Sequence, residues 1–224
     1  MSNDNPEYYK APRASRTSRK VTLKSTVSSR GFLWNHTSDR WAGYESTLER
    51  DFLTILNVRS DVKLWQEQPE PVTYVDDQGK RRTHTFDVSV HLFNGETVAC
   101  DVKPQKRLVR SGIEEVHRLI RRQHPDYADK FLIRTDRHIS RVLVRNAELF
   151  LRARTLRDEE SIEELRRHLI SMHGVYRLAS LVALLNDQAA GFNAVLNLID
   201  SRELKPVTRG SINDNIELEI CKAV

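Results

Sequence analysis

The spacing of apolar residues predicts one helix followed by short strands near the start of the chain. Between positions 44 and 56 apolar residues recur every three or four positions, which is typical of a helix with one buried face. Segments 62–66 and 71–75 are short runs bounded by turn-forming residues and are predicted to be strands. The acidic segment 76–79, which ends in Gly79, is predicted to form the turn that follows them.

The next two segments predict a hairpin. Segment 84–93 is rich in β-branched and aromatic residues, and segment 97–103 continues this character. Asn94 and Gly95 lie between them and form a strong turn signal, because both residue types tolerate positive φ angles. We therefore expect two long antiparallel strands joined by a tight loop.

Helices dominate the second half of the predicted chain. A helix at 111–123, a buried strand at 131–133 and a helix at 140–154 follow the hairpin. Beyond residue 159 the pattern predicts three more helices and then one strand, at 162–170, 176–185, 189–204 and 216–220.

The last three helices and the strand are typical of a winged helix. Its third helix would carry Asn193, Asn197 and Arg202. Because this helix is not notably basic, protein docking is favoured over the reading of a DNA sequence.

Two glutamates lie within the predicted apolar face of helix 44–56. A carboxylate in a buried stripe is costly unless it is paired, protonated or bound to a metal, so Glu45 and Glu49 are both candidate site residues. Glu45 lies near the helix start, where a rim position beside the helix dipole is the simpler interpretation. Glu49 lies deeper in the stripe and is the stronger candidate.

The predicted hairpin carries two acids and a lysine with the spacing of a metal-dependent nuclease. Asp101 and Lys103 are two residues apart and point to one face of the sheet, while Asp87 lies on the partner strand at a similar height. Two carboxylates, with the Val102 carbonyl as a further oxygen ligand, could bind one or two Mg²⁺ (or Mn²⁺) ions for phosphodiester hydrolysis, and Lys103 could steady the developing charge. The alternative is that Asp87 and Asp101 are solvent-facing acids of an edge strand, and that Lys103 is an ordinary residue of a strand end.

The register of this hairpin must be irregular if both acids bind one metal. A two-residue Asn94-Gly95 loop would pair Asp87 with Val102 and would place Asp87 and Asp101 on opposite faces. We therefore predict an odd-length loop, a β-bulge, or strands that separate near Asp87.

Charge is concentrated at the N-terminus. Lys and Arg outnumber Asp and Glu by 36 to 31 over the whole chain. Positions 1–30 hold seven basic residues against two acidic ones and almost no large apolar side chain, which predicts a flexible basic arm. Such an arm suits DNA phosphate contacts, although a solubilising terminus is equally compatible. The candidate DNA-binding residues are Arg13, Arg16, Arg19, Lys20 and Lys24.

Several classes of protein are disfavoured. No apolar run is long enough to span a membrane, and the N-terminus lacks the apolar core of a secretory signal, so a cytoplasmic protein is expected. Cys100 and Cys221 lack the spaced partners of a zinc site or a disulfide framework. His84 and His91 show no paired ligand spacing, and His84 is at most a weak candidate for DNA contact.

The order of elements predicts the fold class. We expect an α/β (α+β) fold, in which a mixed sheet flanked by helices matches the core of restriction-endonuclease-like nucleases. The expected organisation is a basic arm at 1–30, a catalytic domain at 31–155 and a small winged-helix-like domain at 156–224 that binds DNA or a partner.

Four separated motifs resemble those of TnsA, the endonuclease subunit of heteromeric cut-and-paste bacterial transposons. They are Glu45-Ser46-Thr47-Leu48-Glu49, Glu67-Gln68-Pro69, Phe86-Asp87 and Asp101-Val102-Lys103-Pro104, and the resemblance extends over 44–140. Two positions depart from the family pattern, which has Gln or Glu where Asp101 stands and often Pro where Phe86 stands. The shorter Asp101 side chain puts the metal preference in question. Gln68 is expected to support the site or a strand end rather than to bind metal.

This resemblance implies a function and partners. Glu49, Asp87 and Asp101 would form the magnesium site, and Lys103 would complete it. The enzyme would cleave the 5′ ends of a transposon in double-stranded DNA, together with the DDE-class transposase TnsB and the AAA+ ATPase regulator TnsC, in the bacterial cytoplasm. A stand-alone restriction, repair or junction-resolving nuclease, or a catalytically inactive DNA-binding assembly subunit, remains the alternative.

Overall fold

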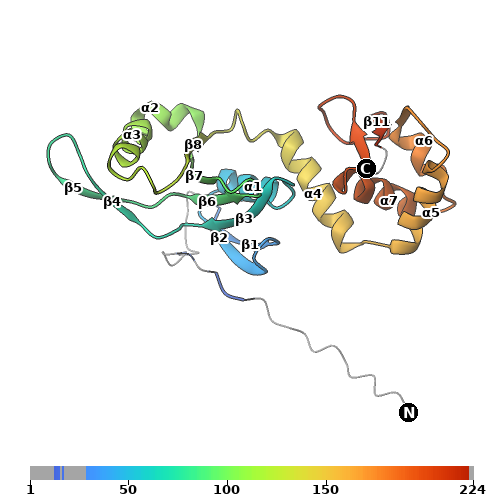
Figure 1. Cartoon of the computed structure of the whole chain (residues 1–224), viewed down its shortest axis with the longest axis horizontal. Coiled ribbons are helices and arrows are strands. Elements are labelled where there is room, and N and C mark those ends of the chain that lie inside the picture. The colour runs from blue at the N-terminus through green and yellow to red at the C-terminus, as the bar shows by residue number, and fades with distance from the viewer. Residues whose placement is uncertain (1–12, 16, 18–28, 222–224) are drawn as a thin grey trace, which may run out of the picture. The chain divides into compact units, whose positions relative to one another are not determined.

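The chain divides into two compact units in a computed structural model that describes residues 13–15, 17 and 29–221 (Figure 1). The first unit is built from the described residues of Met1–Leu53 and from Ser60–Asp136, and the second from Thr54–Arg59 and the described residues of Arg137–Val224. Helix α4 (Arg141–Thr155) therefore belongs to the second unit, whereas the expected boundary at 155/156 placed it in the first.

The first unit is a mixed sheet with helices on it, which confirms the coarse α/β expectation. Its elements are β1 (Gly31–Asn35), β2 (Arg40–Tyr44), α1 (Thr47–Leu56), which begins in this unit, β3 (Val62–Glu67), β4 (Val72–Val75), β5 (Arg81–His84), β6 (Val88–Leu92), β7 (Thr97–Val102), a 3-10 turn η1 (Gln105–Arg107), α2 (Leu108–Ser111), α3 (Ile113–Gln123) and β8 (Lys130–Arg134). The central sheet has the order β3-β6-β7-β8, in which only the β7–β8 pair is parallel. β1–β2 and β4–β5 are separate antiparallel hairpins.

Helix α3 covers the face of the sheet that carries the candidate acids. Leu119 and Ile120 of α3 pack in one buried cluster with Phe86, Ala99 and Phe131. Ala99 and Asp101 share a face of β7, because alternate residues of a strand point the same way. Burial of this apolar cluster therefore fixes α3 over Asp101.

The β6–β7 hairpin has the odd-length loop that a shared site requires. Val88 pairs with Cys100 and His91 with Thr97, and the Leu92 N–H donates to the Glu96 carbonyl. Three residues thus form the loop, and Gly95 takes a φ of 91° in it. This register brings Asp87 opposite Asp101, so the predicted irregularity is confirmed and both acids lie on one face.

The strand expected at 84–93 is broken, which corrects the sequence prediction. β5 ends at His84 and β6 begins at Val88, so Asp87 lies in a bend between them. The reason is that the two parts have different partners: β5 pairs with β4, whereas β6 pairs with β3 and β7. The Asp87 carbonyl accepts from the Gln68 N–H at 2.9 Å, which holds the bend against the end of β3.

Part of the expected flexible arm is docked on the first unit. The Arg13 carbonyl accepts from the Trp41 N–H at 3.0 Å, and Thr17 donates to the Gln68 side chain at 2.6 Å. The arm is thus not free at these described positions, since its backbone finds a partner on β2. The Arg13 residue is exposed. The other four candidate DNA-binding residues, Arg16, Arg19, Lys20 and Lys24, lie outside the described residues.

The second unit packs four helices and a small sheet around one core. Its further elements are α5 (Glu159–Leu169), β9 (Val175–Arg177), α6 (Leu178–Val182), α7 (Gln188–Asp200), β10 (Leu204–Pro206) and β11 (Glu217–Ile220). Helices α4, α5 and α6 all contact α7, and the antiparallel sheet has the order β10-β11-β9. Within the described ranges, no helix has both the length and the apolar character that crossing a membrane requires.

Two expectations for this unit are corrected. The predicted helix 176–185 begins as strand β9, because Gly174 turns the chain at a φ of 98° and Tyr176 pairs with Leu218. The predicted third helix ends at Asp200, and Arg202 lies beyond it with a φ of 67°. Asn197 of that helix is buried and donates to the Ala153 carbonyl, so its amide supports the fold and is not available to DNA.

Candidate functional site

Asp87 and Lys103 form the open part of the candidate site. Lys103 Nζ donates to Asp87 Oδ2 at 2.9 Å, and the Val102 N–H donates to the same oxygen at 2.7 Å. The Asp87 and Lys103 side chains are 18% and 30% exposed, so a ligand can reach them from solvent. Burial raises the pKa of Asp87, and the negative Asp101 raises it further, while Lys103 opposes both effects.

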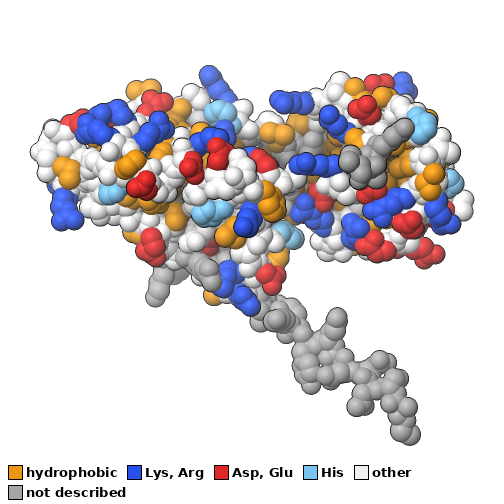
Figure 2. Space-filling view, viewed as in Figure 1, with side chains coloured by type: hydrophobic (Ala, Val, Ile, Leu, Met, Phe, Trp, Pro, Cys, Tyr) orange, Lys and Arg blue, Asp and Glu red, His pale blue; other side chains and the backbone are white. Residues whose placement is uncertain are grey.

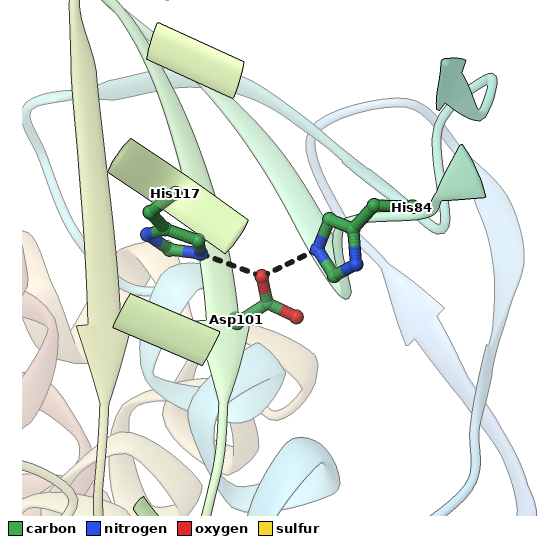
Figure 3. A group of neighbouring side chains, drawn as sticks. All are labelled: His84, Asp101 and His117. Atoms are coloured by element: carbon green, nitrogen blue, oxygen red, sulfur yellow. Dashed lines mark hydrogen bonds and ion pairs between the residues drawn. The ribbon is translucent and has the colours of Figure 1, made fainter. Parts of the chain in front are cut away.

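Asp101 is the closed part of the site. Its side chain is 1% exposed, and its Oδ2 atom accepts from the Nε2 atoms of His84 and His117, each at 2.8 Å (Figure 3). Burial alone would raise the pKa of Asp101, but the hydrogen bonds from His117 and His84 and the positive Lys103 bring it well below its usual range. Asp101 is therefore held as a carboxylate in the interior.

The other carboxylate oxygen of Asp101, Oδ1, differs from Oδ2 in its contacts. Oδ1 is buried and has no hydrogen-bond partner among the described residues. Lys103 Nζ lies 3.5 Å away and provides charge compensation without a hydrogen bond. A buried carboxylate oxygen without a hydrogen-bond partner is unusual, since such atoms are normally satisfied by protein or water.

Glu49 joins this cluster from the first turn of α1. Its Oε2 accepts from the Glu45 N–H at 2.9 Å, and its N–H donates to Ser46 Oγ at 3.2 Å, so Ser46 and Glu49 cap the helix reciprocally. Burial raises the pKa of Glu49 to about 7, and repulsion by Asp87 contributes to the rise. This repulsion implies that Glu49 lies close to Asp87. It therefore supports Glu49 as a member of the site.

Lys103 is the cationic member of the site. Burial disfavours its charged form, but attraction by Asp87 and Asp101 outweighs burial and raises its pKa above the usual value. The lysine therefore stays protonated at neutral pH. One ammonium group interacts with three carboxyl groups, so full ionisation of the acids gives the cluster an excess of negative charge that a divalent cation would neutralise.

A supporting layer holds the acids in place. Gln68, which has a positive φ of 38°, fixes the bend at Asp87 through its backbone N–H. Its side chain accepts from Thr17, and the neighbouring Glu67 accepts from Ser15. Gln68 thus supports the bend that carries Asp87.

Three unpaired cations follow the site directly along the chain. Lys106, Arg107 and Arg110 line an open hollow of about 490 Å³ with Ser111, and their side chains form no ion pair with another described residue. Most arginines of α3 differ, because Arg118 and Arg122 face Asp77. Lys and Arg side chains gather over the part of the first unit that carries α2 and α3 (Figure 2).

The structure brings together the predicted acids and lysine, but two histidines were missed. Glu49, Asp87, Asp101 and Lys103 belong to one electrostatic cluster, and Val102 lies beside them at the end of β7. From the sequence, the histidines are expected to be ordinary residues, His117 among them, with His84 at most a weak candidate for DNA contact. A signal for His117 was present, because it lies four residues after Ile113 and three before Ile120 on the buried face of a helix.

The comparisons with known proteins assign no family. No protein-family model matches the chain, and no curated protein matches it at a significant level. The function is therefore inferred from the geometry of the chain's own residues and from the resemblance of its motifs.

Proposed function

We propose that this protein is a divalent-metal-dependent DNA endonuclease, with Glu49, Asp87, Asp101 and Lys103 as its catalytic residues. The observation that carries the proposal is the Oδ1 atom of Asp101. It is buried, it belongs to a negatively charged carboxylate, and no described residue donates a hydrogen bond to it; Asp101 lies at the same sheet face as Asp87. Binding of a cation would remove the cost of leaving this oxygen unsatisfied.

The donor set fits Mg²⁺ or Mn²⁺. Glu49, Asp87 and Asp101 offer carboxylate oxygens, with the Val102 carbonyl as a further candidate, and hard divalent cations prefer oxygen ligands. When bound, the ion would polarise a DNA phosphate and lower the pKa of a water molecule. The Lys103 ammonium would stabilise the charge that develops on the phosphate, and Glu49, with a pKa of about 7, could accept a proton at neutral pH.

The unpaired cations next to the site support DNA as the substrate. Lys106, Arg107 and Arg110 begin three residues after Lys103, so a strand bound at the acids could place its neighbouring phosphates on them. Cations without a protein partner remain available for phosphate oxygens. The same role for Arg13 and for the basic positions 16, 19, 20 and 24 remains a prediction.

The order of the elements supports the finer fold assignment within this proposal. In the first unit, a helix precedes an antiparallel hairpin that bears the acids, and a crossover helix leads to the parallel strand β8, as in restriction-endonuclease-like nucleases. In the second unit, the order α5-β9-α6-α7-β10-β11 resembles that of a winged helix. Burial of Asn197 in α7 favours protein docking for this unit over base reading.

The motif resemblance makes a TnsA-type transposon endonuclease the preferred biological role. The protein would cleave the 5′ ends of a transposon while a DDE-class transposase of the TnsB type cleaves the 3′ ends. An AAA+ ATPase of the TnsC type would regulate both, and the second unit is the natural docking site for it. A stand-alone nuclease that uses the same residues is the second candidate.

The proposal is tested by DNA cleavage in Mg²⁺ or Mn²⁺, with plasmid DNA as substrate. The native chain is compared with Asp87→Asn and with Asp126→Asn, an exposed acid away from the cluster as a matched control. Cleavage by the isolated chain that only Asp87→Asn abolishes would indicate a stand-alone nuclease. Cleavage that also requires the transposase would indicate the transposon subunit. If DNA is bound but Asp87→Asn has no effect on any reaction, the protein is an inactive assembly subunit.

A further inference from the structure

The contacts of His84 and His117 with Asp101 determine which ring nitrogen of each histidine carries a proton. Each Nε2 atom lies 2.8 Å from Asp101 Oδ2, and an ionised carboxylate can only accept hydrogen bonds. Each ring must therefore carry a proton on Nε2. Both donors converge on one oxygen from opposite sides (Figure 3).

This convergence makes the two oxygens of Asp101 inequivalent. Oδ2 accepts two hydrogen bonds, whereas Oδ1 accepts none and has Lys103 Nζ at 3.5 Å. Rotation of the carboxylate out of its present plane would break both histidine contacts. The histidines thus fix the plane of the carboxylate, so that its other oxygen faces Lys103.

The two rings are themselves held by aromatic packing. His84, at the end of β5, meets Phe86 edge to face with 4.7 Å between ring centroids. His117, on α3, is 5% exposed and lies 5.3 Å from the same phenylalanine ring. Phe86 is fully buried, so this support is rigid.

We propose that His84 and His117 are positioning residues, which hold Asp101 Oδ2 so that Oδ1 is presented as a ligand to a divalent cation shared with Asp87. This inference rests on the proposed metal-dependent function and extends it to residues outside the cluster of acids. Partners of this kind orient metal ligands, and their loss typically lowers metal affinity about 10- to 100-fold.

A metal held by the histidines themselves is the competing arrangement. The three side chains could supply ligand atoms for one ion. Around a tetrahedral ion with bonds of about 2.1 Å, however, ligand atoms lie about 3.4 Å apart. The observed 2.8 Å separations are hydrogen-bond distances, at which a proton lies between nitrogen and oxygen.

The test is Mn²⁺ binding, measured by calorimetry and by electron paramagnetic resonance. His84→Leu and His117→Leu remove the donors, whereas His84→Gln and His117→Gln keep an N–H group that can reach the carboxylate. We expect the leucine variants to bind Mn²⁺ about 10- to 100-fold more weakly and the glutamine variants to recover most of that loss. His91→Leu, which removes a histidine bonded to Thr97 in the same sheet, should leave the affinity unchanged.

Three outcomes would overturn the inference in distinguishable ways. Equal Mn²⁺ affinity of the native chain and folded leucine variants would refute the positioning role and leave the proposed function intact. Tight Zn²⁺ binding that needs His84 and His117, without an Nε2 proton on either ring in ¹⁵N NMR spectra of the metal-free protein, would assign the histidines as ligands instead. Failure of the native chain to bind any divalent ion would refute the proposed function and this role together.

Discussion

Replacing Glu49 with Gln should make the metal-free protein less sensitive to rising pH. The native glutamate is half-buried near Asp87, and its pKa is raised from 4.5 to about 7. Below pH 4.5 the group is protonated in both the folded and the unfolded chain. Between 4.5 and about 7 only the unfolded chain releases the proton, so the folded state loses stability as the pH rises.

The size of this loss follows from the pKa. One pKa unit corresponds to about 1.4 kcal/mol, so a rise from 4.5 to about 7 corresponds to about 3 kcal/mol of unfolding free energy. Above about pH 7 the folded glutamate is ionised as well, and the loss stays constant. Glutamine also weakens the cap contacts with Glu45 and Ser46, and the part of those contacts that depends on the charge of Glu49 is already contained in its pKa. The difference between two pH values therefore isolates the charge.

Urea unfolding in a chelator, at about pH 5 and about pH 8, measures the effect. The native chain should lose about 2.5 kcal/mol more than Glu49→Gln over this interval, because part of the loss has already occurred at about pH 5. Glu114→Gln, which changes an exposed glutamate of α3, should behave as the native chain does. Added Mg²⁺ should restore stability at the higher pH in the native chain more than in Glu49→Gln. Parallel pH profiles for the native chain and Glu49→Gln would refute the burial of an ionisable Glu49 beside Asp87.

Three further predictions concern the core, the hairpin and the DNA surface. Phe86→Ala should lower the free energy of unfolding by about 3–5 kcal/mol in urea titrations, because the fully buried ring supports both histidines; a loss under about 1 kcal/mol would contradict this packing. Gly95→Ala should cost about 1–2 kcal/mol through its positive φ alone, since no atom lies within 4 Å of an added Cβ, and thermal unfolding would detect it. Alanine at Lys106, Arg107 and Arg110 together should reduce the slope of log K for DNA against log salt by about 3, and an unchanged slope would place the phosphates elsewhere. The charge-matched control is alanine at the exposed cations Lys63, Lys80 and Arg81.

Glu49 and Asp101 could be predicted as site residues because each is an acidic residue among the apolar positions of its helix or strand. Glu49 interrupts an apolar helix face, and Asp101 interrupts a strand that is otherwise buried. The odd hairpin loop followed from the requirement that Asp87 and Asp101 face one side. The requirement that both acids bind one metal thus predicted the register of the hairpin, and the β6–β7 pairing has that register.

The remaining features depend on contacts distant in sequence. The break between β5 and β6 arises because these strands have different partners, which the β-rich character of 84–93 does not reveal. Strand β9 forms through pairing with β11, about 40 residues later. His84 and His117 meet at Asp101 only after α3 has packed on the sheet, so spacing along the chain gave no ligand pattern for them.

Calorimetry can show whether Asp87 and Asp101 bind a divalent cation. Mg²⁺ and Mn²⁺ are titrated into the native chain, Asp87→Ala, Asp101→Ala and the exposed control Asp126→Ala, with DNA present. We expect binding by the native chain and the control, and loss of binding in both site variants, because the two carboxylates share one ion. Binding that survives in Asp87→Ala and Asp101→Ala, or its absence from the native chain, would contradict a metal-dependent nuclease site at these residues.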